Sequence, residues 1–255
     1  MGEAFTVDAM TVQVHDSDTE LASDAAAEAA EAIGAAIGAR GVANVMFATG
    51  NSQLGFLEAL TARDDVDWDR LVGFHMDEYR GVSAEHPASF RRYLRERIVD
   101  RVHPGEFQFI AGDAADPAGE CARYAALLRD HPLDLCCLGI GENGHLAFND
   151  PPVADFDDRV DVKVVALDEA CRRQQVGEGH FATVPDVPAE AITVTIPALL
   201  RAGRVLAIVP DARKRDPVRV ALTGPVTTVC PASILRTRSN VTLHLDRSSA
   251  ADVAP

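Results

Sequence analysis

The sequence predicts an α/β fold in which helices cover both faces of an open, doubly wound and mostly parallel sheet. Apolar segments of strand length alternate with helical segments along the chain, which is the order of βαβ units. Residues 133–140 are apolar almost without alternation, as in a central parallel strand buried on both faces. Composition does not shift along the 255 residues, so we expect one domain spanning 1–255.

The first long helix is predicted from an apolar residue at every fourth position. Ser17 or Asp18 suits its N-cap, and Gly38 or Gly41 suits its end. Its inward face is expected to carry Leu21, Ala25, Ala29, Ile33 and Ile37.

The other elements follow from the same periodicities. Helices are expected after residue 52, with Leu54, Leu57 and Leu60 inward, and over residues 89–99 and 117–128. Strands of the parallel sheet are expected at residues 42–48, 71–76, 133–140, 160–165, 191–196, 205–209 and 241–245.

Charge and composition exclude several classes of function. A formal charge of −15 argues against general binding to nucleic acid or to anionic membranes, which requires a clustered positive surface. The apolar runs are shorter than a membrane span, and the N-terminus lacks the pattern of a signal peptide. We therefore expect a cytoplasmic protein. Five cysteines at no metal-ligand spacing are expected to be buried free thiols.

The turn Thr49-Gly50-Asn51-Ser52 lies between a predicted strand and a predicted helix. Backbone N–H groups, two hydroxyls and the positive end of a helix dipole suit a phosphate group there. No Gly-Lys-Ser/Thr follows, which disfavours a nucleoside triphosphate. Ordinary capping by Asn51 or Ser52 is the alternative.

A second glycine-rich loop, residues 139–144, fits the dinucleotide pattern G-x-G-x-x-G. That pattern requires a helix beginning within the glycines, whereas residues 145–150 run into Pro151-Pro152. A dinucleotide site is therefore disfavoured.

Acid/base groups follow two of the predicted strands. His145 and Asp150 share one loop, where a carboxylate can orient an imidazole, and Asp77 and Glu78 follow another strand. A capped loop with a solvent-facing histidine is the alternative. With no metal-ligand cluster in the sequence, we expect chemistry without a metal or an organic cofactor.

Three motifs, taken together, resemble those of the glucosamine-6-phosphate deaminases. Their order and spacing match over about residues 20–246, and the resemblance implies a modified Rossmann-like fold. The motifs are Ala48 to Ser52, Phe74 to Tyr79 with Glu85 to Phe90, and Gly139 to Pro151.

The resemblance implies a phosphorylated amino sugar as substrate and a role for several residues. Asp77 matches the base that moves a proton between C2 and C1. His145 matches the histidine that opens the sugar ring, with Asn143 and Asp150 at its partner positions. Thr49, Gly50, Asn51, Ser52 and Lys214 match phosphate-binding positions.

The chain departs from the family pattern at three positions. Asn143 replaces an aspartate, and Asp150 replaces a longer glutamate. A phosphate-binding arginine is missing, since its position falls near Glu178-Gly179. We therefore consider Arg172 or Arg173 as a substitute cation.

Four questions stay open from the sequence. A 6-phosphogluconolactonase is the nearest rival enzyme, although the continuation Ala147 to Pro151 differs from its usual Ala-Ser-Leu-Phe-Pro. Galactosamine 6-phosphate is a rival substrate, and a non-catalytic phosphosugar-binding regulator is a rival function. The residues do not decide whether the protein forms a homo-oligomer.

Overall fold

The computed structural model describes residues 3–253, in which the largest sheet has the strand order β1-β2-β11-β10-β7-β3-β4-β6. Its pairs are parallel except for β1 with β2. The strands are β1 Glu3–Val7, β2 Met10–His15, β3 Ala43–Phe47, β4 Leu71–His75, β6 Glu106–Gln108, β7 Leu135–Leu138, β10 Arg204–Val209 and β11 Val241–Asp246.

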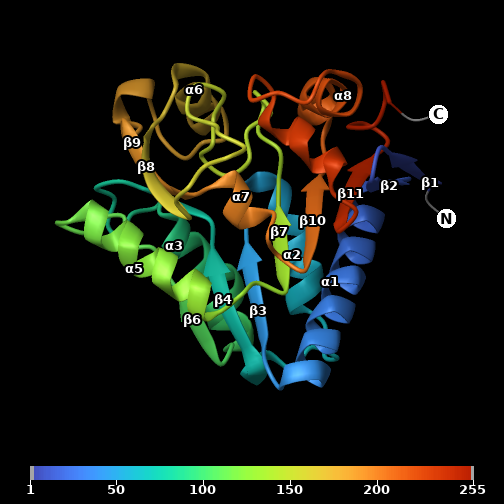
Figure 1. The fold of residues 1–255 in the computed structure, drawn as a ribbon, viewed down its shortest axis with the longest axis horizontal. Helices are drawn as coiled ribbons and strands as arrows, with labels where there is room; N and C mark the ends of the chain where they lie inside the picture. Colours follow the sequence, from blue (N-terminus) through green and yellow to red (C-terminus); the bar gives the residue numbers. More distant parts are fainter. Residues whose placement is uncertain (1–2, 254–255) are drawn as a thin grey trace.

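Helices connect these strands, and α1, α2 and α5 lie where the sequence predicts a helix from residue 17 or 18, after residue 52 and over 117–128. Figure 1 shows the arrows of β3, β7 and β10 pointing toward the end of the molecule that carries α6 and α8. The α-helices are α1 Asp18–Arg40, α2 Leu54–Thr61, α3 Phe90–Leu94, α4 Asp100–Val102, α5 Pro117–Asp130, α6 Glu169–Gly177, α7 Ile196–Leu199 and α8 Arg215–Thr223.

Helices cover both faces of the sheet, as expected of a doubly wound fold. On β3, Val45 and Phe47 join the apolar cluster formed with α1 and α2, whereas Met46 joins the cluster formed with α5, α7 and α8. Alternate residues of a strand point to opposite faces, so the uninterrupted apolar runs of the central strands follow from this two-sided burial.

Two predicted strands lie elsewhere than expected. The segments expected at 160–165 and 191–196 form β8 Val162–Ala166 and β9 Glu190–Val194, which pair antiparallel in a separate sheet with β5 Asp77–Tyr79. The prediction that they belong to the parallel sheet is wrong, because apolar patterning reveals a strand but not its partner.

Further differences concern single elements. The N-terminal hairpin of β1 and β2 and the short strand β6 were not predicted. Leu54, expected to be buried, is 38% exposed, and Phe56 lies in the core beside Leu57 and Leu60. The predicted helix over 89–99 begins with α3 and continues as a π-helical turn, Arg95–Val99.

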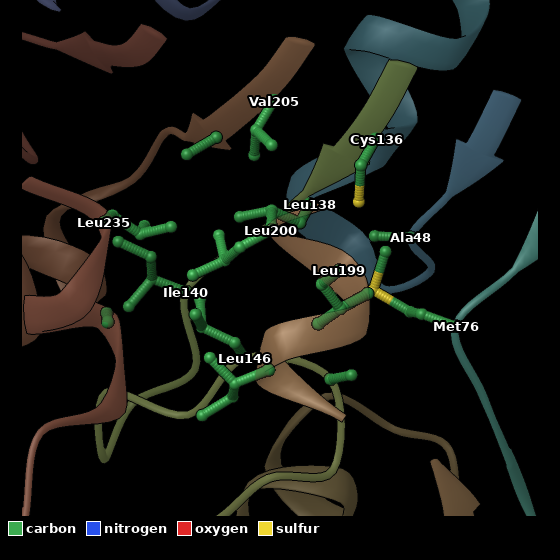
Figure 2. Packing of buried hydrophobic residues seen from close by; sticks show 14 of the residues in the cluster. Ala48, Met76, Cys136, Leu138, Ile140, Leu146, Leu199, Leu200, Val205 and Leu235 are labelled. Atoms are coloured by element: carbon green, nitrogen blue, oxygen red, sulfur yellow. The ribbon is translucent and has the colours of Figure 1, made fainter. Parts of the chain in front are cut away.

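The strand order reverses between β3 and β7, since the chain proceeds from β3 to β4 on one side and from β7 to β10 on the other. Ligands of open α/β sheets bind beyond such a reversal point. Figure 2 shows the core beneath it, where Leu138, Ile140 and Leu146 lie near Leu199, the last residue of α7, and Leu200, which follows it. This packing fixes the loop that follows β7.

Two expectations about composition can be compared with the described residues. All five cysteines are free, as expected, and four of them are buried, whereas Cys121 is partly exposed. Within residues 3–253, no helix has both the length and the apolar character that a membrane crossing requires.

Candidate active site

A cavity lies beyond the carboxyl ends of β3, β4 and β7, at the reversal point of the sheet. Six of the residues singled out from the sequence line this cavity, so the predicted phosphate loop and the predicted acid/base groups share one cavity. They are Thr49, Gly50, Ser52, Asp77, His145 and Lys214.

The loop after β3 exposes its backbone to this cavity. Gly50 has φ +97°, a conformation that suits glycine, and its carbonyl accepts a hydrogen bond from the Tyr93 hydroxyl at 2.8 Å. Gly50 is itself the N-cap of the turn Asn51–Gln53, with no side-chain capping bond. Capping by Asn51 or Ser52 is therefore absent, which leaves Ser52 to line the cavity.

Asn51 differs from the rest of the predicted phosphate loop. It does not line the cavity, and its amide lies 3.4 Å from the Glu178 carbonyl oxygen. Its side chain therefore joins the loop to the end of α6.

Asp77 lies at the junction of the two sheets, because a single residue separates the end of β4 from the start of β5. Its side chain is 6% exposed, and Oδ1 has no hydrogen-bond partner among the described residues. Burial, together with the nearby carboxylates of Glu78 and Asp150, raises the pKa of Asp77 well above its usual range. A carboxyl group in this state is suited to accept and return a proton.

Glu78, the next residue, has a structural role. Its carboxylate accepts hydrogen bonds from the Ser89 hydroxyl at 2.8 Å and from the Arg91 backbone N–H at 2.9 Å. It therefore binds the first turn of α3, where a negative charge is favoured.

His145, Asn143 and Asp150 form one connected group. Nδ1 of His145 lies 2.9 Å from Oδ1 of Asp150, and the Asn143 amide donates to the same oxygen at 2.9 Å. The Asn143 side-chain oxygen accepts from the His145 backbone N–H at 3.1 Å. Burial raises the pKa of Asp150, but hydrogen bonds from His145 and Asn143 outweigh it, so the net pKa is lowered. An ionised Asp150 orients the imidazole.

Glycine is required beside this group. A Cβ atom on Gly141 would lie 2.2 Å from the His145 ring, so any larger residue would displace the imidazole. Gly144 has φ +81°, and a Cβ there would lie 2.7 Å from Cys230 Sγ. Gly141 and Gly144 of the G-x-G-x-x-G match thus leave room for the side chains of His145 and Cys230. No helix begins within residues 139–150, in agreement with the rejection of a dinucleotide site.

Lys214 is the cation of the cavity wall. It is 6% exposed and follows Asp211, whose side chain accepts from the Arg213 backbone N–H at 2.9 Å. Burial lowers the pKa of Lys214, and nearby carboxylates, chiefly that of Glu178, oppose this effect. The other lysine, Lys163, pairs with Asp158 outside the cavity.

The substitute cations considered from the sequence do not reach the cavity. The Arg172 guanidinium donates to the carbonyl oxygens of Val184 and Val187, and Arg173 pairs with Glu169 on the surface. That expectation is wrong, because both side chains extend from other sides of α6.

The structure adds residues that sequence reasoning missed. Gln174, Glu178 and His180 line the cavity, and Gly179, with φ +82°, ends α6 so that its last turn faces the loop after β3. A glycine just past a helical segment was the available signal.

Cys171, which the sequence analysis did not single out, adds a thiol beside His145 and Asp150. Its Sγ, a nitrogen of His145 and an oxygen of Asp150 all lie within 4.8 Å of one another, a grouping that residue spacing did not reveal. Burial raises the pKa of the Cys171 thiol, and the nearby Asp150 carboxylate adds to this effect. The thiol is therefore held neutral.

The comparison with known protein families agrees with this geometry. The sequence profile described as "Glucosamine-6-phosphate isomerases/6-phosphogluconolactonase" matches residues 16–244. The chain belongs to this family. The three motifs predicted from the sequence all lie within the residues that the family profile of glucosamine-6-phosphate isomerases and 6-phosphogluconolactonases matches.

Individual relatives lie on the deaminase side of the family. A glucosamine-6-phosphate deaminase from Exiguobacterium sibiricum is 38% identical over 204 residues, which cover 80% of this chain and 79% of that protein. A glucosamine-6-phosphate deaminase from Listeria monocytogenes is 32% identical over 195 residues, covering 76% and 81%.

Solved structures of the family share the fold. A monomeric glucosamine-6-phosphate deaminase superimposes with a TM-score of 0.86 at 30% identity, covering 94% of this chain and 98% of that one. A 6-phosphogluconolactonase from Shewanella baltica gives a TM-score of 0.76 at 19% identity, covering 95% and 97%. The second match shows the fold alone.

Proposed function

We propose that this protein is a glucosamine-6-phosphate deaminase, which converts glucosamine 6-phosphate and water to fructose 6-phosphate and ammonia. The observation that supports this most directly is Asp77, a buried carboxyl group with an unpartnered oxygen in the cavity wall. Aldose–ketose isomerisation moves a proton from C2 to C1, and that step needs a base of this kind.

The other groups have complementary roles in the proposed reaction. His145, oriented by Asp150 and Asn143, transfers the proton that opens the sugar ring. Asp77 then removes the C2 proton and returns it to C1, which leaves an imine at C2. Water adds to the imine, and ammonia leaves. The loop at residues 49–52 and Lys214 hold the phosphate group.

A 6-phosphogluconolactonase is the second candidate function, since the fold and the histidine loop are common to both. Lactone hydrolysis leaves the C2–H bond intact and therefore does not require Asp77 as a base for a C2 proton. A galactosamine 6-phosphate substrate and a non-catalytic phosphosugar-binding regulator are distinguished from the main proposal by assay.

The test is production of ammonia and fructose 6-phosphate by the purified protein given glucosamine 6-phosphate. Galactosamine 6-phosphate and 6-phosphogluconolactone are assayed in parallel. We expect ammonia and ketose phosphate in equal amounts, with Asp77→Asn abolishing both. Acid released only from the lactone, or phosphosugar binding without turnover, would overturn the proposal.

The proposed site is complete within one chain, because the loop after β3, Asp77 and His145 of a single chain line the same cavity. We therefore propose one domain over residues 1–255 that acts without needing a homo-oligomer, in the cytoplasm, where its free thiols would persist. Specific activity independent of protein concentration, with mass measured by light scattering, tests the first point.

A further inference from the structure

Glu178 places a carboxylate at the end of the cavity where the phosphate group is proposed to bind. Its Oε2 lies 3.8 Å from the position that a Cβ on Gly50 would take, and its side chain is 10% exposed. Lys214 lines the same cavity. An anion bound in the loop after β3 would therefore meet a fixed negative charge as well as a positive one.

Several contacts hold this carboxylate in place. The Gln174 amide donates to Oε1 at 2.7 Å, and Nε2 of His180 lies 3.3 Å from Oε2. The backbone N–H of His180 donates to the Gln175 carbonyl across the left-handed Gly179, which closes the end of α6. The position of Glu178 is thus set by the helix terminus.

The surrounding groups favour the ionised form of this carboxylate. Burial raises the pKa of Glu178, but the hydrogen bonds from His180 and Gln174 and the charge of Lys214 outweigh burial and hold the pKa below its usual range. Glu178 therefore balances Lys214 when no anion is bound. The other charged groups near this pair are Glu142, Asp211 and Arg213, and the charge of Glu178 also acts on the neutral phenols of Tyr79 and Tyr93.

Entry of a phosphate monoester disturbs this balance. The group carries about −1.5 to −2 charges near neutral pH, and Lys214 supplies one positive charge. Like charges in a partly desolvated site disfavour each other's ionisation, so a bound proton relieves the repulsion.

We propose that Glu178 couples phosphate binding in this cavity to the uptake of one proton by the Glu178 carboxylate. The inference rests on the proposed function only in placing a phosphate group at this end of the cavity. As a consequence, Glu178 weakens substrate binding as pH rises. KM is expected to increase by up to about tenfold per pH unit above neutrality, while kcat changes less.

Calorimetry on the purified protein measures the coupling directly. Sulfate is the first probe, since it has no titratable proton near neutral pH, and inorganic phosphate is the second. The binding enthalpy of each anion in two buffers of different ionisation enthalpy gives the number of protons taken up. For sulfate we expect about one proton in the wild-type protein.

Glu178→Gln should remove most of this uptake and tighten sulfate binding about tenfold. Glu169→Gln is the matched control, because Glu169 lies on the same helix but pairs with Arg173 on the surface. Should Glu178→Gln fail to fold, the buffer dependence of the wild-type protein still decides the question. Sulfate binding without proton uptake in the wild type would overturn the inference, as would no binding of either anion.

The inference and the proposed function fail separately. Turnover of glucosamine 6-phosphate with no proton uptake on anion binding would contradict the role of Glu178 and leave the deaminase assignment intact. Proton uptake lost in Glu178→Gln, with no turnover by the wild type, would support the role of Glu178 and contradict the assignment.

Discussion

Asn143 donates its side-chain amide to Oδ1 of Asp150 at 2.9 Å, the oxygen that also lies 2.9 Å from Nδ1 of His145. An aspartate at position 143, usual in the deaminase family, has no N–H group to donate. The departures at 143 and 150 are therefore a matched pair, in which an amide supports the shorter carboxylate. The site can keep its histidine oriented with one charge fewer.

Restoring the family aspartate should consequently impair this protein. We expect Asn143→Asp to lower kcat/KM for glucosamine 6-phosphate at least about tenfold, because two adjacent carboxylates repel and one hydrogen bond is lost. Asn143→Ala, which loses the bond without adding charge, should be less impaired. Equal or higher activity of Asn143→Asp would contradict the matched-pair interpretation.

Asp77→Asn should stabilise the fold while abolishing turnover. The raised pKa of Asp77 means that the native state favours the protonated form. Its stabilising effect is complete below the unfolded pKa, about 3.9, and is lost as pH rises through the native pKa. Asparagine mimics the protonated form at every pH.

The gain in melting temperature should therefore be near zero in acid and should grow toward neutral pH. Each kcal/mol of unfolding free energy that the substitution adds corresponds to about 2–4 °C. Thermal unfolding across this pH range measures it. An Asp77→Asn variant that melts below the wild type near neutral pH would show that the ionised carboxylate is a stabilising group.

Gly141→Ala should displace the imidazole. The added Cβ would lie 2.2 Å from the His145 ring, and a misplacement of about 1 Å can cost about 100-fold in rate. Gly34→Ala in α1 is the control, because nothing lies within 4 Å of its added Cβ. We expect kcat to fall only in Gly141→Ala, with its melting temperature showing that the variant is folded.

Lys214→Ala should raise KM for the phosphosugar by about 10- to 100-fold, since a hydrogen bond to a charged group contributes roughly 1.5–3 kcal/mol. Arg173→Ala should leave KM unchanged, because Arg173 pairs with Glu169 away from the cavity. Steady-state kinetics of the two variants measures the difference. A rise in KM for Arg173→Ala alone would reverse the assignment of the cation.

The sequence predicted the helices and strands that are specified by the pattern of apolar and capping residues within a single segment. The four-residue apolar repeat of α1, the caps at Ser17 and Gly41 and the uninterrupted apolar strands follow from how one segment buries its own face. The motifs at 49–52 and 139–150 were also visible, because phosphate loops and glycine turns depend on neighbouring residues. Their grouping followed from the rule that parallel strands place their carboxyl ends at one edge.

Only the tertiary structure decided which segments became partners. The strand β9 pairs with β5 and β8 pairs with β9, in a sheet separate from the parallel one, and this pairing places Asp77 at the junction of two sheets. Glu178 lies 127 positions along the chain from Asn51, and its carbonyl oxygen contacts the Asn51 amide in the loop after β3. Pairing energies of this kind depend on geometry between distant segments, whereas a local pattern records only which faces must be buried.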